Sequence, residues 1–379
     1  MSAPPPQRSS RPRALPGAEW APYHALAEVL DTLPSGFPPT RDGVELRLLR
    51  RIFTAEEARL AGRLRTTFET ADAVAARTGE PAPALEARLE AMWGKGQIEA
   101  EGPRGARRFR LIPFIIGIYE YQLDRMDREL AALFERYAPV WGGMFMQHEP
   151  PLFLVVPAQS APGDHHHHAL PFHRAAAILE AGQSFAVKNC VCRTERRLVG
   201  KGCDHPLETC LAIGHRADAF AESPFSGRAI TRAQAQAILA AAEEAGLVHN
   251  VHNVERGHTF ICNCCACSCG MVKAARRYGA AQRALNAHYL AEVEAEACVG
   301  CGLCADERCP MGAITVKQER AAVITARCIG CGLCATACPE QAIRLTLRPQ
   351  DERRAPPADE RAWMDERAKN RAVSYDAYR

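Results

Sequence analysis

Cysteines recur in a duplicated pattern near the C-terminus of the chain. Each copy has three cysteines spaced Cys-x2-Cys-x2-Cys, followed by a Cys-Pro pair; the copies read CVGCGLCADERCP and CIGCGLCATACP. The eight cysteines are Cys298, Cys301, Cys304, Cys309, Cys328, Cys331, Cys334 and Cys338. Three thiolates that converge from one tight loop, completed by a fourth, are the donor set of a cubane iron–sulfur cluster. The pattern therefore predicts one-electron redox chemistry.

Glycines lie between these cysteines in both copies. Gly300 and Gly302 occur in the first loop, and Gly330 and Gly332 in the second. Because glycine adopts positive φ angles without strain, these residues let the backbone curl around a cluster. The loop amides can then donate hydrogen bonds to the sulfurs, which offsets the charge of the cluster and adjusts its potential. A zinc site of four thiolates would be expected to show two Cys-x2-Cys pairs instead, so the pattern favours clusters.

Residues 292–347 resemble the bacterial-type two-cluster ferredoxin family. The resemblance implies two [4Fe–4S] clusters, in which the cysteine of each Cys-Pro pair binds the cluster of the other copy. The ligands of cluster one are then Cys298, Cys301, Cys304 and Cys338. Those of cluster two are Cys328, Cys331, Cys334 and Cys309. The first copy departs from the family, because four residues, 305–308, precede its Cys-Pro pair where the family pattern has three. We expect the loop to tolerate the added residue.

Nine further cysteines lie upstream of this module. They are Cys190, Cys192, Cys203, Cys210, Cys262, Cys264, Cys265, Cys267 and Cys269. Two strand-like segments, 184–191 and 258–263, lead directly into the two groups that contain them. In an extended chain, Cys-x-Cys places both sulfurs on one face, so each pair could serve one metal centre. We expect a third cluster, even a fourth, or a zinc site here. Which thiols bind stays open, as does the alternative that some are structural buried thiols.

The elements that must position these cysteines begin with an N-terminal region of helices. Thr54 and Glu57 predict the start of one helix through a capping box, and further helices are expected at 70–79 and 83–94. Alternating apolar residues on both sides of the turn at 102–105 predict a β-hairpin. Three helices followed by a hairpin resemble a winged-helix domain.

The whole chain is expected to be α+β, with a winged-helix-like N-terminal domain, a mixed cysteine-rich middle domain and a ferredoxin-like dicluster domain. Within the middle domain, Thr231 and Gln234 predict the capping box of a helix. A short helix is expected within 360–369, without a convincing apolar face. The expected segments are a disordered tail 1–22, the winged-helix-like domain 23–125, the middle domain 126–285, the dicluster domain 286–348 and a charged tail 349–379.

The arrangement as a whole resembles multidomain 4Fe–4S ferredoxin-like proteins. In these, a winged-helix-like start and a middle region with CxCR and CNCC-type motifs precede the dicluster module. Here the matching residues are Cys190 to Arg193 and Cys262 to Cys265. The resemblance implies redox function without implying a substrate.

Composition limits the compartment and the class of protein. The chain has 379 residues, 17 cysteines and a formal net charge of +3, with 47% hydrophobic residues. It shows no apolar run long enough for a membrane helix and no apolar segment typical of a signal peptide near Met1. Clustered cysteines in a reducing compartment are metal ligands or redox groups more often than disulfides. We therefore expect a cytoplasmic protein without membrane insertion.

Nucleic acid is not an expected partner. The hairpin contains Arg104, Arg107, Arg108 and Arg110, a candidate patch for phosphate contacts. The third helix, however, exposes Glu86, Arg88 and Glu90, and two carboxylates among three charges disfavour DNA. A docking or structural role is the favoured interpretation of the winged-helix-like domain.

Three functions remain open from the sequence. The favoured one is an electron-transfer protein or subunit, which carries electrons through two [4Fe–4S] clusters to or from a partner oxidoreductase. Alternatively, the chain is itself an oxidoreductase, with a substrate-binding cluster in the region 190–269. The third possibility is a redox-responsive DNA-binding regulator. No glycine-rich nucleotide-binding loop is present, so organic cofactors are not expected, and no catalytic residue stands out. The oligomeric state stays open.

Overall fold

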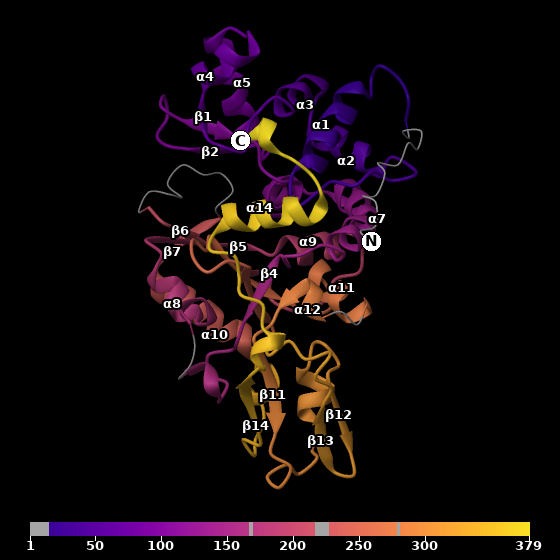
Figure 1. The fold of residues 1–379 in the computed structure, drawn as a ribbon, viewed down its shortest axis with the longest axis vertical. Helices are drawn as coiled ribbons and strands as arrows, with labels where there is room; N and C mark the ends of the chain where they lie inside the picture. Colours follow the sequence, from indigo (N-terminus) through magenta and orange to yellow (C-terminus); the bar gives the residue numbers. More distant parts are fainter. Residues whose placement is uncertain (1–14, 167–169, 217–226, 279–280) are drawn as a thin grey trace, which may run out of the picture. The chain divides into compact units, whose positions relative to one another are not determined.

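The computed structural model describes residues 15–166, 170–216, 227–278 and 281–379. The chain divides into two compact units: Met1–His148 with Met364–Arg379, and Glu149–Trp363 (Figure 1). This division differs from the expected segments, and it places most of the expected middle domain and the dicluster domain in one unit. Residues 126–148, expected in the middle domain, and the last residues, expected to be a tail, belong to the first unit.

The first unit combines helices with a small antiparallel sheet of order β1-β3-β2. The predicted capping box of Thr54 and Glu57 begins α3, and Thr70 caps α4, which ends at Gly79. These helix starts are confirmed, whereas the winged-helix interpretation rests on the order of the elements and stays a prediction. The elements are α1 (Ala21–Thr32), α2 (Val44–Ile52), α3 (Ala55–Ala61), β1 (Glu69–Thr70), α4 (Ala71–Thr78), α5 (Ala82–Gly94), β2 (Glu99–Glu101), β3 (Arg108–Arg110), α6 (Tyr119–Tyr121) and α7 (Arg128–Phe145).

Helix α7 belongs to the first unit because its aromatic side chains complete the core there. It contacts α2. The ring of Tyr137 lies 5.0 Å from that of Phe37, and Tyr137 is fully buried. The indole of Trp141 donates to the carbonyl of Gly36 at 3.2 Å. A boundary at residue 125 would leave this apolar face without its partner.

The C-terminal segment is folded rather than a tail. Helix α14 (Glu360–Arg371) contains the boundary between the two units. In the first unit, the buried Arg367 side chain donates to the backbone carbonyls of Pro34, His148 and Phe145 at 3.2, 2.7 and 2.9 Å. Burial lowers the pKa of this guanidinium to about 8. The hydrogen bonds of this buried side chain hold the helix in place, so the helix does not need a continuous apolar face.

The second unit is built on a seven-stranded sheet of order β10-β4-β8-β9-β6-β5-β7. Neighbouring strands are antiparallel except β10 and β4, which are parallel. The strands are β4 (Phe153–Val156), β5 (Ser184–Asn189), β6 (Glu208–Gly214), β7 (Arg228–Ile230), β8 (Val248–His252), β9 (Phe260–Cys264) and β10 (Leu285–Asn286). The two strand-like segments expected to precede the cysteine groups are β5 and β9, so both are confirmed.

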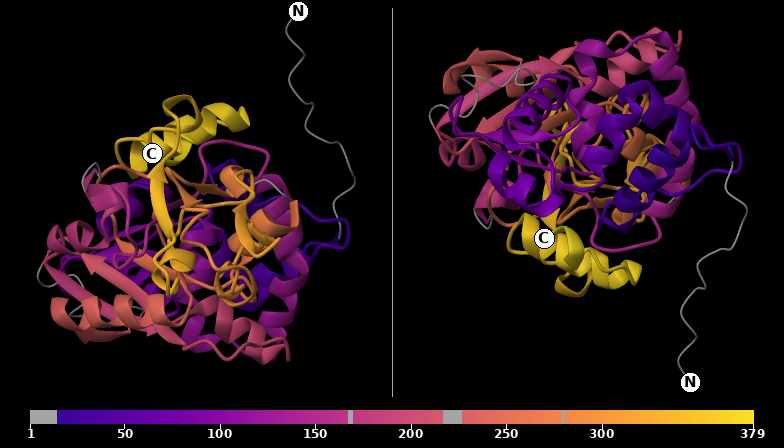
Figure 2. Two further views of the ribbon diagram at one scale, coloured as in Figure 1. Left: turned by 90° about the horizontal axis from the view of Figure 1, so that it is seen from below. Right: turned by 90° about the horizontal axis from the view of Figure 1, so that it is seen from above.

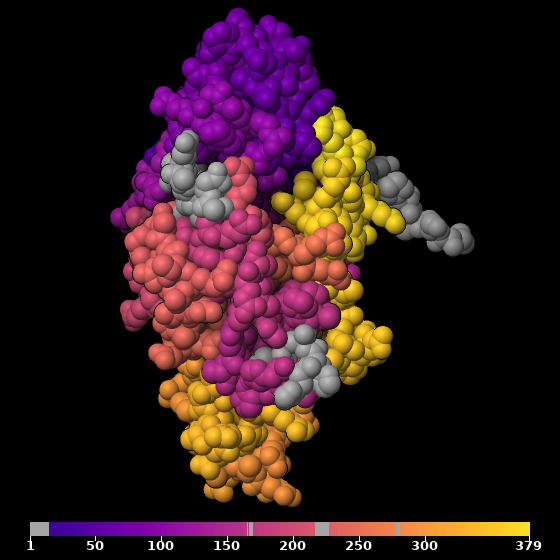
Figure 3. Space-filling view, turned by 90° about the vertical axis from the view of Figure 1, so that its left-hand side faces the viewer, coloured from indigo at the N-terminus to yellow at the C-terminus, as the bar shows by residue number. Residues whose placement is uncertain are grey.

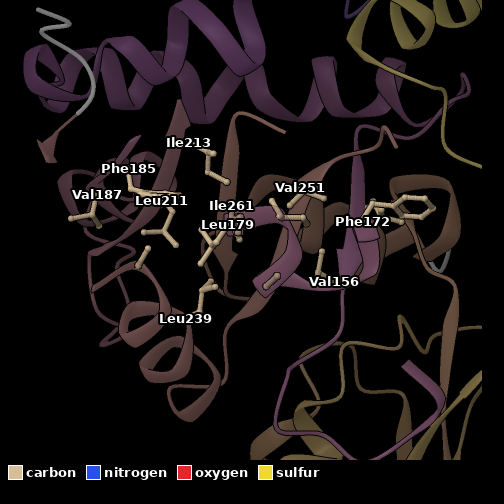
Figure 4. Close-up of a cluster of buried hydrophobic side chains, with 14 residues drawn as sticks. Val156, Phe172, Leu179, Phe185, Val187, Leu211, Ile213, Leu239, Val251 and Ile261 are labelled. Atoms are coloured by element: carbon tan, nitrogen blue, oxygen red, sulfur yellow. The ribbon is translucent and has the colours of Figure 1, made fainter. Parts of the chain in front are cut away.

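Helices α8 and α10 pack together, and α10 contacts the sheet. The capping box of Thr231 and Gln234 begins α10, as predicted. Leu179 of α8 and Leu239 of α10 meet Leu211 and Ile261 of the sheet in one buried cluster (Figure 4). The helices of this unit are α8 (Ala175–Glu180), α9 (Val191–Leu198), α10 (Arg232–Glu244), α11 (Gly270–Tyr278), α12 (Ala281–Ala284) and α13 (Leu333–Thr336).

The duplicated cysteine module forms two antiparallel two-stranded sheets that lie side by side (Figures 1 and 2). One pairs β11 (Tyr289–Val293) with β14 (Ile343–Leu347), and the other pairs β12 (Ile314–Lys317) with β13 (Arg320–Val323). At the lower end of the space-filling view, the module's orange and yellow residues lie directly against the sheet's salmon and magenta residues (Figure 3). Short helical turns occur at Phe114–Ile118, Leu123–Arg125, Asp164–His166, Pro171–His173, Cys304–Arg308, Gln350–Glu352 and Asp376–Tyr378.

Within the described ranges, no helix has both the length and the apolar character needed to span a bilayer.

Candidate metal centres

The thiols of the module act on one another across the two copies of the motif. Burial raises the pKa of the Cys304 thiol. The neighbouring thiols of Cys301, Cys298 and Cys338 raise it further, which places Cys338 with the first copy. Three of the four members thus come from one loop, and the fourth comes from the second Cys-Pro pair.

The second group is arranged in the same way. Burial raises the pKa of the Cys331 thiol to about 12, and the thiols of Cys309 and Cys328 contribute to that rise. Burial also raises the pKa of the Cys334 thiol, and the neighbouring thiols of Cys331, Cys328, Cys309 and Cys304 add to the rise. Cys309, from the first Cys-Pro pair, therefore lies among the thiols of the second copy.

Backbone amides point at these sulfurs. The amide of Ala313 donates to Cys309 Sγ at 3.1 Å, and that of Ala321 donates to Cys298 Sγ at 3.4 Å. Cys328 Sγ accepts from Gly330 at 3.4 Å and from Ala291 at 3.5 Å. Amide donors stabilise thiolates and lower the cost of placing a negative cluster in the protein. The donor set and its amides therefore fit [4Fe–4S] clusters.

Two loop glycines bring the backbone very close to neighbouring strands. Gly300 has a φ of +68°, and a Cβ there would lie 2.4 Å from the carbonyl oxygen of Glu319. Gly330 has a φ of +60°, and a Cβ would lie 2.2 Å from the carbonyl oxygen of Tyr289. Both the φ angle and the contact exclude a larger residue, so the loops can curl as the sequence predicted.

The two groups differ in their exposure to solvent. Cys301 is exposed, and the neighbouring Val299 is 60% exposed. Cys328 and Cys334 of the other group are buried. Val299 and Cys301 therefore lie at a solvent-exposed end of the module.

Arg308 joins the module to the sheet. Its guanidinium donates to the carbonyls of Glu243 and Glu244, both at 2.8 Å, which are the last residues of α10. It also donates to the carbonyl of Leu333 and the hydroxyl of Thr336, both at 3.2 Å. A cation at the C-terminus of a helix is favoured by the helix dipole. Arg308 lies in the segment that is one residue longer than the family pattern, so the departure noted in the sequence provides the contact.

A second contact lies beside the buried group of the module. The amide of Ala158, in the loop after β4, donates to the carbonyl of Cys331 at 2.9 Å. Gly332 approaches the side chains of Ala158 and Ala161 so closely that a Cβ would lie 2.8 Å from Ala161 Cβ. The group of Cys328, Cys331, Cys334 and Cys309 therefore faces the sheet.

Six of the nine upstream cysteines form a chain of neighbouring thiols. The Cys192 thiol raises the pKa of Cys190, and the Cys210 thiol raises that of Cys262. The Cys262 thiol in turn raises the pKa of Cys264. Cys269 interacts with both Cys192 and Cys264. The fold thus joins the CxCR group at the start of α9 to the CNCC group at the end of β9. We call these six cysteines the six-thiol group: Cys190, Cys192, Cys210, Cys262, Cys264 and Cys269.

The other three upstream cysteines, Cys203, Cys265 and Cys267, lie together as a separate set. All nine are thus placed in one of two sets. The sequence alone could not divide them, because Cys203 comes from a loop between α9 and β6 whose path has no periodic signature.

A buried arginine lies between the two sets. Arg193 is fully buried, and its Nη1 donates to the carbonyl of Asn263 at 3.0 Å. It also donates to the hydroxyl of Thr209. Burial lowers the pKa of this guanidinium, but the thiols of Cys190, Cys265 and Cys264 raise it above its ordinary value. A buried cation requires a nearby anion. Among these thiols, the Arg193 hydrogen bond helps to lower the pKa of Cys265 to about 7, so Cys265 is the one best suited to be a thiolate.

A hydrogen-bonded chain of buried side chains leads from this region toward the module. The His249 ring contacts Asn263 Oδ1 at 2.5 Å and Glu243 Oε1 at 3.1 Å. Glu243 accepts from the Ser160 hydroxyl at 2.7 Å and the Gln159 amide at 2.6 Å. Burial alone would raise the pKa of Glu243, but these hydrogen bonds lower it to about 2. Asn263 stands between two cysteines in the sequence, which marks it as a neighbour of the thiols, whereas no sequence signal marks His249 or Glu243.

The arginines of the N-terminal hairpin are largely paired with glutamates. Arg107 pairs with Glu90, Arg108 with Glu101, and Arg110 with Glu99. These carboxylates offset the charge of the candidate phosphate-contacting patch. The pairing is consistent with a docking or structural role for this region.

Residues 297–342 match the family model described as "4Fe-4S dicluster domain". The match includes all eight cysteines of the module. Neither the curated proteins nor the solved structures contain a match to the chain.

Proposed function

We propose that this chain, which contains a 4Fe–4S dicluster domain at residues 297–342, is an electron-transfer protein that exchanges single electrons with a partner redox protein. The pair of crossed thiol groups supports the proposal most directly. The first group would hold cluster one through Cys298, Cys301, Cys304 and Cys338. The second would hold cluster two through Cys328, Cys331, Cys334 and Cys309. When bound, the two [4Fe–4S] clusters supply reversible one-electron chemistry.

The partner docks at the loop around Val299 and Cys301. This loop combines an exposed apolar side chain with an exposed ligand thiol, so a docked protein would come close to the first group. In the second group Cys328 and Cys334 are buried, and the group is held by Arg308 against α10 and by Ala158 in the loop after β4. The difference in exposure supports a direction, from the partner through the first group and the second group toward the sheet.

Within the chain, electrons from the module reach the six-thiol group. Its thiols surround the end of β9 and the start of α9, next to the buried guanidinium of Arg193. Six neighbouring thiols exceed the four ligands of one [4Fe–4S] cluster, so this group can hold a third cluster. The cation at Arg193 would stabilise its negative charge.

Electron paramagnetic resonance of the reduced protein, prepared without oxygen, tests the proposal. We expect signals from two magnetically interacting clusters in the module and a further signal from the six-thiol group. The proposal fails if the reduced protein gives no cluster signal and contains no labile sulfide.

Replacing Arg308 by methionine should loosen the contact between module and sheet. The variant leaves the C-terminal carbonyls of α10 without their donor, and we expect a loss of about 1–3 kcal/mol in the free energy of unfolding of the second unit. Hydrogen exchange at the amides of 158–161 and 333–336 should become faster in the same variant. Chemical denaturation and exchange measured by mass spectrometry provide the two measurements.

Arg327→Met is the matched control, since Arg327 donates to the carbonyl of Gly312 within the module at 3.4 Å. It should leave exchange at 158–161 unchanged. Equal effects from the two variants would show that Arg308 does not anchor the module.

A further inference from the structure

Cys203, Cys265 and Cys267 stand apart from the other upstream cysteines in their geometry. Their three sulfur atoms lie within 4.8 Å of one another, and Cys203 Sγ is 3.9 Å from Cys265 Sγ. Cys203 lies in the loop after α9, and the other two lie in the turn between β9 and α11. We name this set the three-thiol site.

The spacing of these sulfurs fits a single metal ion. Two thiolates bound to one tetrahedral zinc at about 2.3 Å lie about 3.8 Å apart. In a cubane, each thiolate binds a different iron, so the thiolates lie farther apart. The module provides a comparison within the same chain. Across the described residues, the three-thiol site is the single group of three candidate ligands whose ligand atoms all lie within 4.8 Å of one another. No three cysteines of the module lie that close together.

Contacts of the protein hold this geometry in place. Arg197 Nη2 donates to the carbonyl of Cys203 at 3.2 Å and to that of His205 at 3.1 Å, which fixes the loop after α9. Cys265 is buried against Ala242 and Leu247, with Cys203 packed beside them. The chain therefore brings the sulfurs together through contacts that do not depend on a metal, and such preorganisation favours binding.

The charge around the site is balanced by Arg193. Three thiolates and one divalent ion have a net charge of −1, and the fully buried guanidinium of Arg193 supplies +1. This side chain hydrogen-bonds the Cys265 sulfur, and its Nε has no partner among the described residues. Arg193 lies beside both sets of thiols, and its positive charge lowers the cost of burying the anionic site.

We propose that Cys203, Cys265 and Cys267 bind one Zn²⁺ ion through three thiolates, with a fourth coordination position open to solvent. Zinc prefers thiolates in a tetrahedral arrangement, and sites with three protein ligands keep the fourth place for water or another small ligand. Cys267 is exposed, so solvent reaches the site. The buried Ser268 hydroxyl lies 3.4 Å from Cys203 Sγ, within hydrogen-bonding distance of that sulfur. This site does not depend on the clusters of the proposed function.

Metal analysis of the full-length protein, purified without oxygen, tests the proposal. We expect about one zinc per chain in addition to iron, and X-ray absorption at the zinc edge should give three sulfur neighbours at about 2.3 Å. Cys267→Ser should reduce the zinc content severalfold while iron and labile sulfide stay at the wild-type level. Because Cys267 is exposed, this substitution preserves the packing of the buried side chains.

Two controls separate this site from the clusters. Cys210→Ser, in the six-thiol group, and Cys301→Ala, in the module, should both retain zinc. In the wild-type protein, Cys267 should resist alkylation by iodoacetamide until a chelator removes the zinc, as mass spectrometry of the peptide would detect. This second measurement does not require a folded variant.

The proposal is overturned if Cys267→Ser loses iron and sulfide together, because the three thiols would then belong to a cluster. It is also overturned if the anaerobic protein contains no zinc, or if Cys267 is alkylated equally with and without chelator. None of these outcomes alters the expected module signals, so they are distinct from failure of the proposed electron transfer.

Discussion

Cys338→Ser is expected to remove the cluster of the first copy, although Cys338 lies in the second copy of the motif. Its thiol lies beside that of Cys304, where it would provide the fourth ligand of cluster one. Loss of that ligand should lower the iron content by up to about four per chain or convert the cluster to a form with fewer irons. Iron analysis and the resonance spectrum of the reduced protein measure the change.

Four variants together make the test specific. Cys338→Ser should give the same residual spectrum as Cys301→Ala, and Cys309→Ser should give the same residual spectrum as Cys331→Ser. The opposite pairing, with Cys338→Ser matching Cys331→Ser, would mean that each copy binds its own cluster. That result would contradict the crossed arrangement of thiols.

Arg193→Met should abolish the centre at the six-thiol group. The guanidinium is fully buried beside Cys190, Cys264 and Cys265, so the variant leaves thiolates without their cation. Removing one partner of a buried ion pair costs about 3–5 kcal/mol. We therefore expect loss of the third cluster signal, a lower free energy of unfolding and weaker zinc binding, while both module signals remain.

Arg193→Lys should give an intermediate result. Lysine keeps the charge but lacks the planar fork that reaches both the Asn263 carbonyl and the Thr209 hydroxyl. Arg228→Met is the matched control in the same unit, because Arg228 is exposed and pairs with Glu208 at the surface. Its effect on the free energy of unfolding should be much smaller than that of Arg193→Met. Retention of the third signal in Arg193→Met would show that the thiols do not need this cation.

The sequence could predict features that depend on short spacings. The loops of the module follow from Cys-x2-Cys-x2-Cys with glycine between, and the helix starts at Thr54 and Thr231 follow from capping boxes. Both are local, because a few neighbouring residues determine the geometry. The strands before the cysteine groups were predictable for the same reason.

Long-range contacts could not be predicted from such spacings. The division of the upstream cysteines depends on the antiparallel pairing of β6 with β9 and on the loop that returns Cys203 to Cys265. Helix α14 is held by the buried Arg367, a residue type that patterns assign to the surface. The sequence shows that the segment containing Arg308 is one residue longer than the family pattern. It does not show the partners of Arg308, because the end of α10 lies far away in the sequence.

The second unit thus connects three sets of thiols through named contacts. Arg308 and Ala158 hold the buried group of the module against the sheet. The chain from Glu243 through His249 to Asn263 continues toward the six-thiol group, and Arg193 lies between that group and the three-thiol site. These contacts are the physical basis for proposing one route for electrons.

The central claim is that two crossed groups of four thiols each hold an iron–sulfur cube. Iron and labile sulfide per chain, measured after purification without oxygen, test it most directly. The account predicts about eight of each from the module and about twelve when the six-thiol group is also filled. A colourless protein that contains zinc and no inorganic sulfide would contradict it.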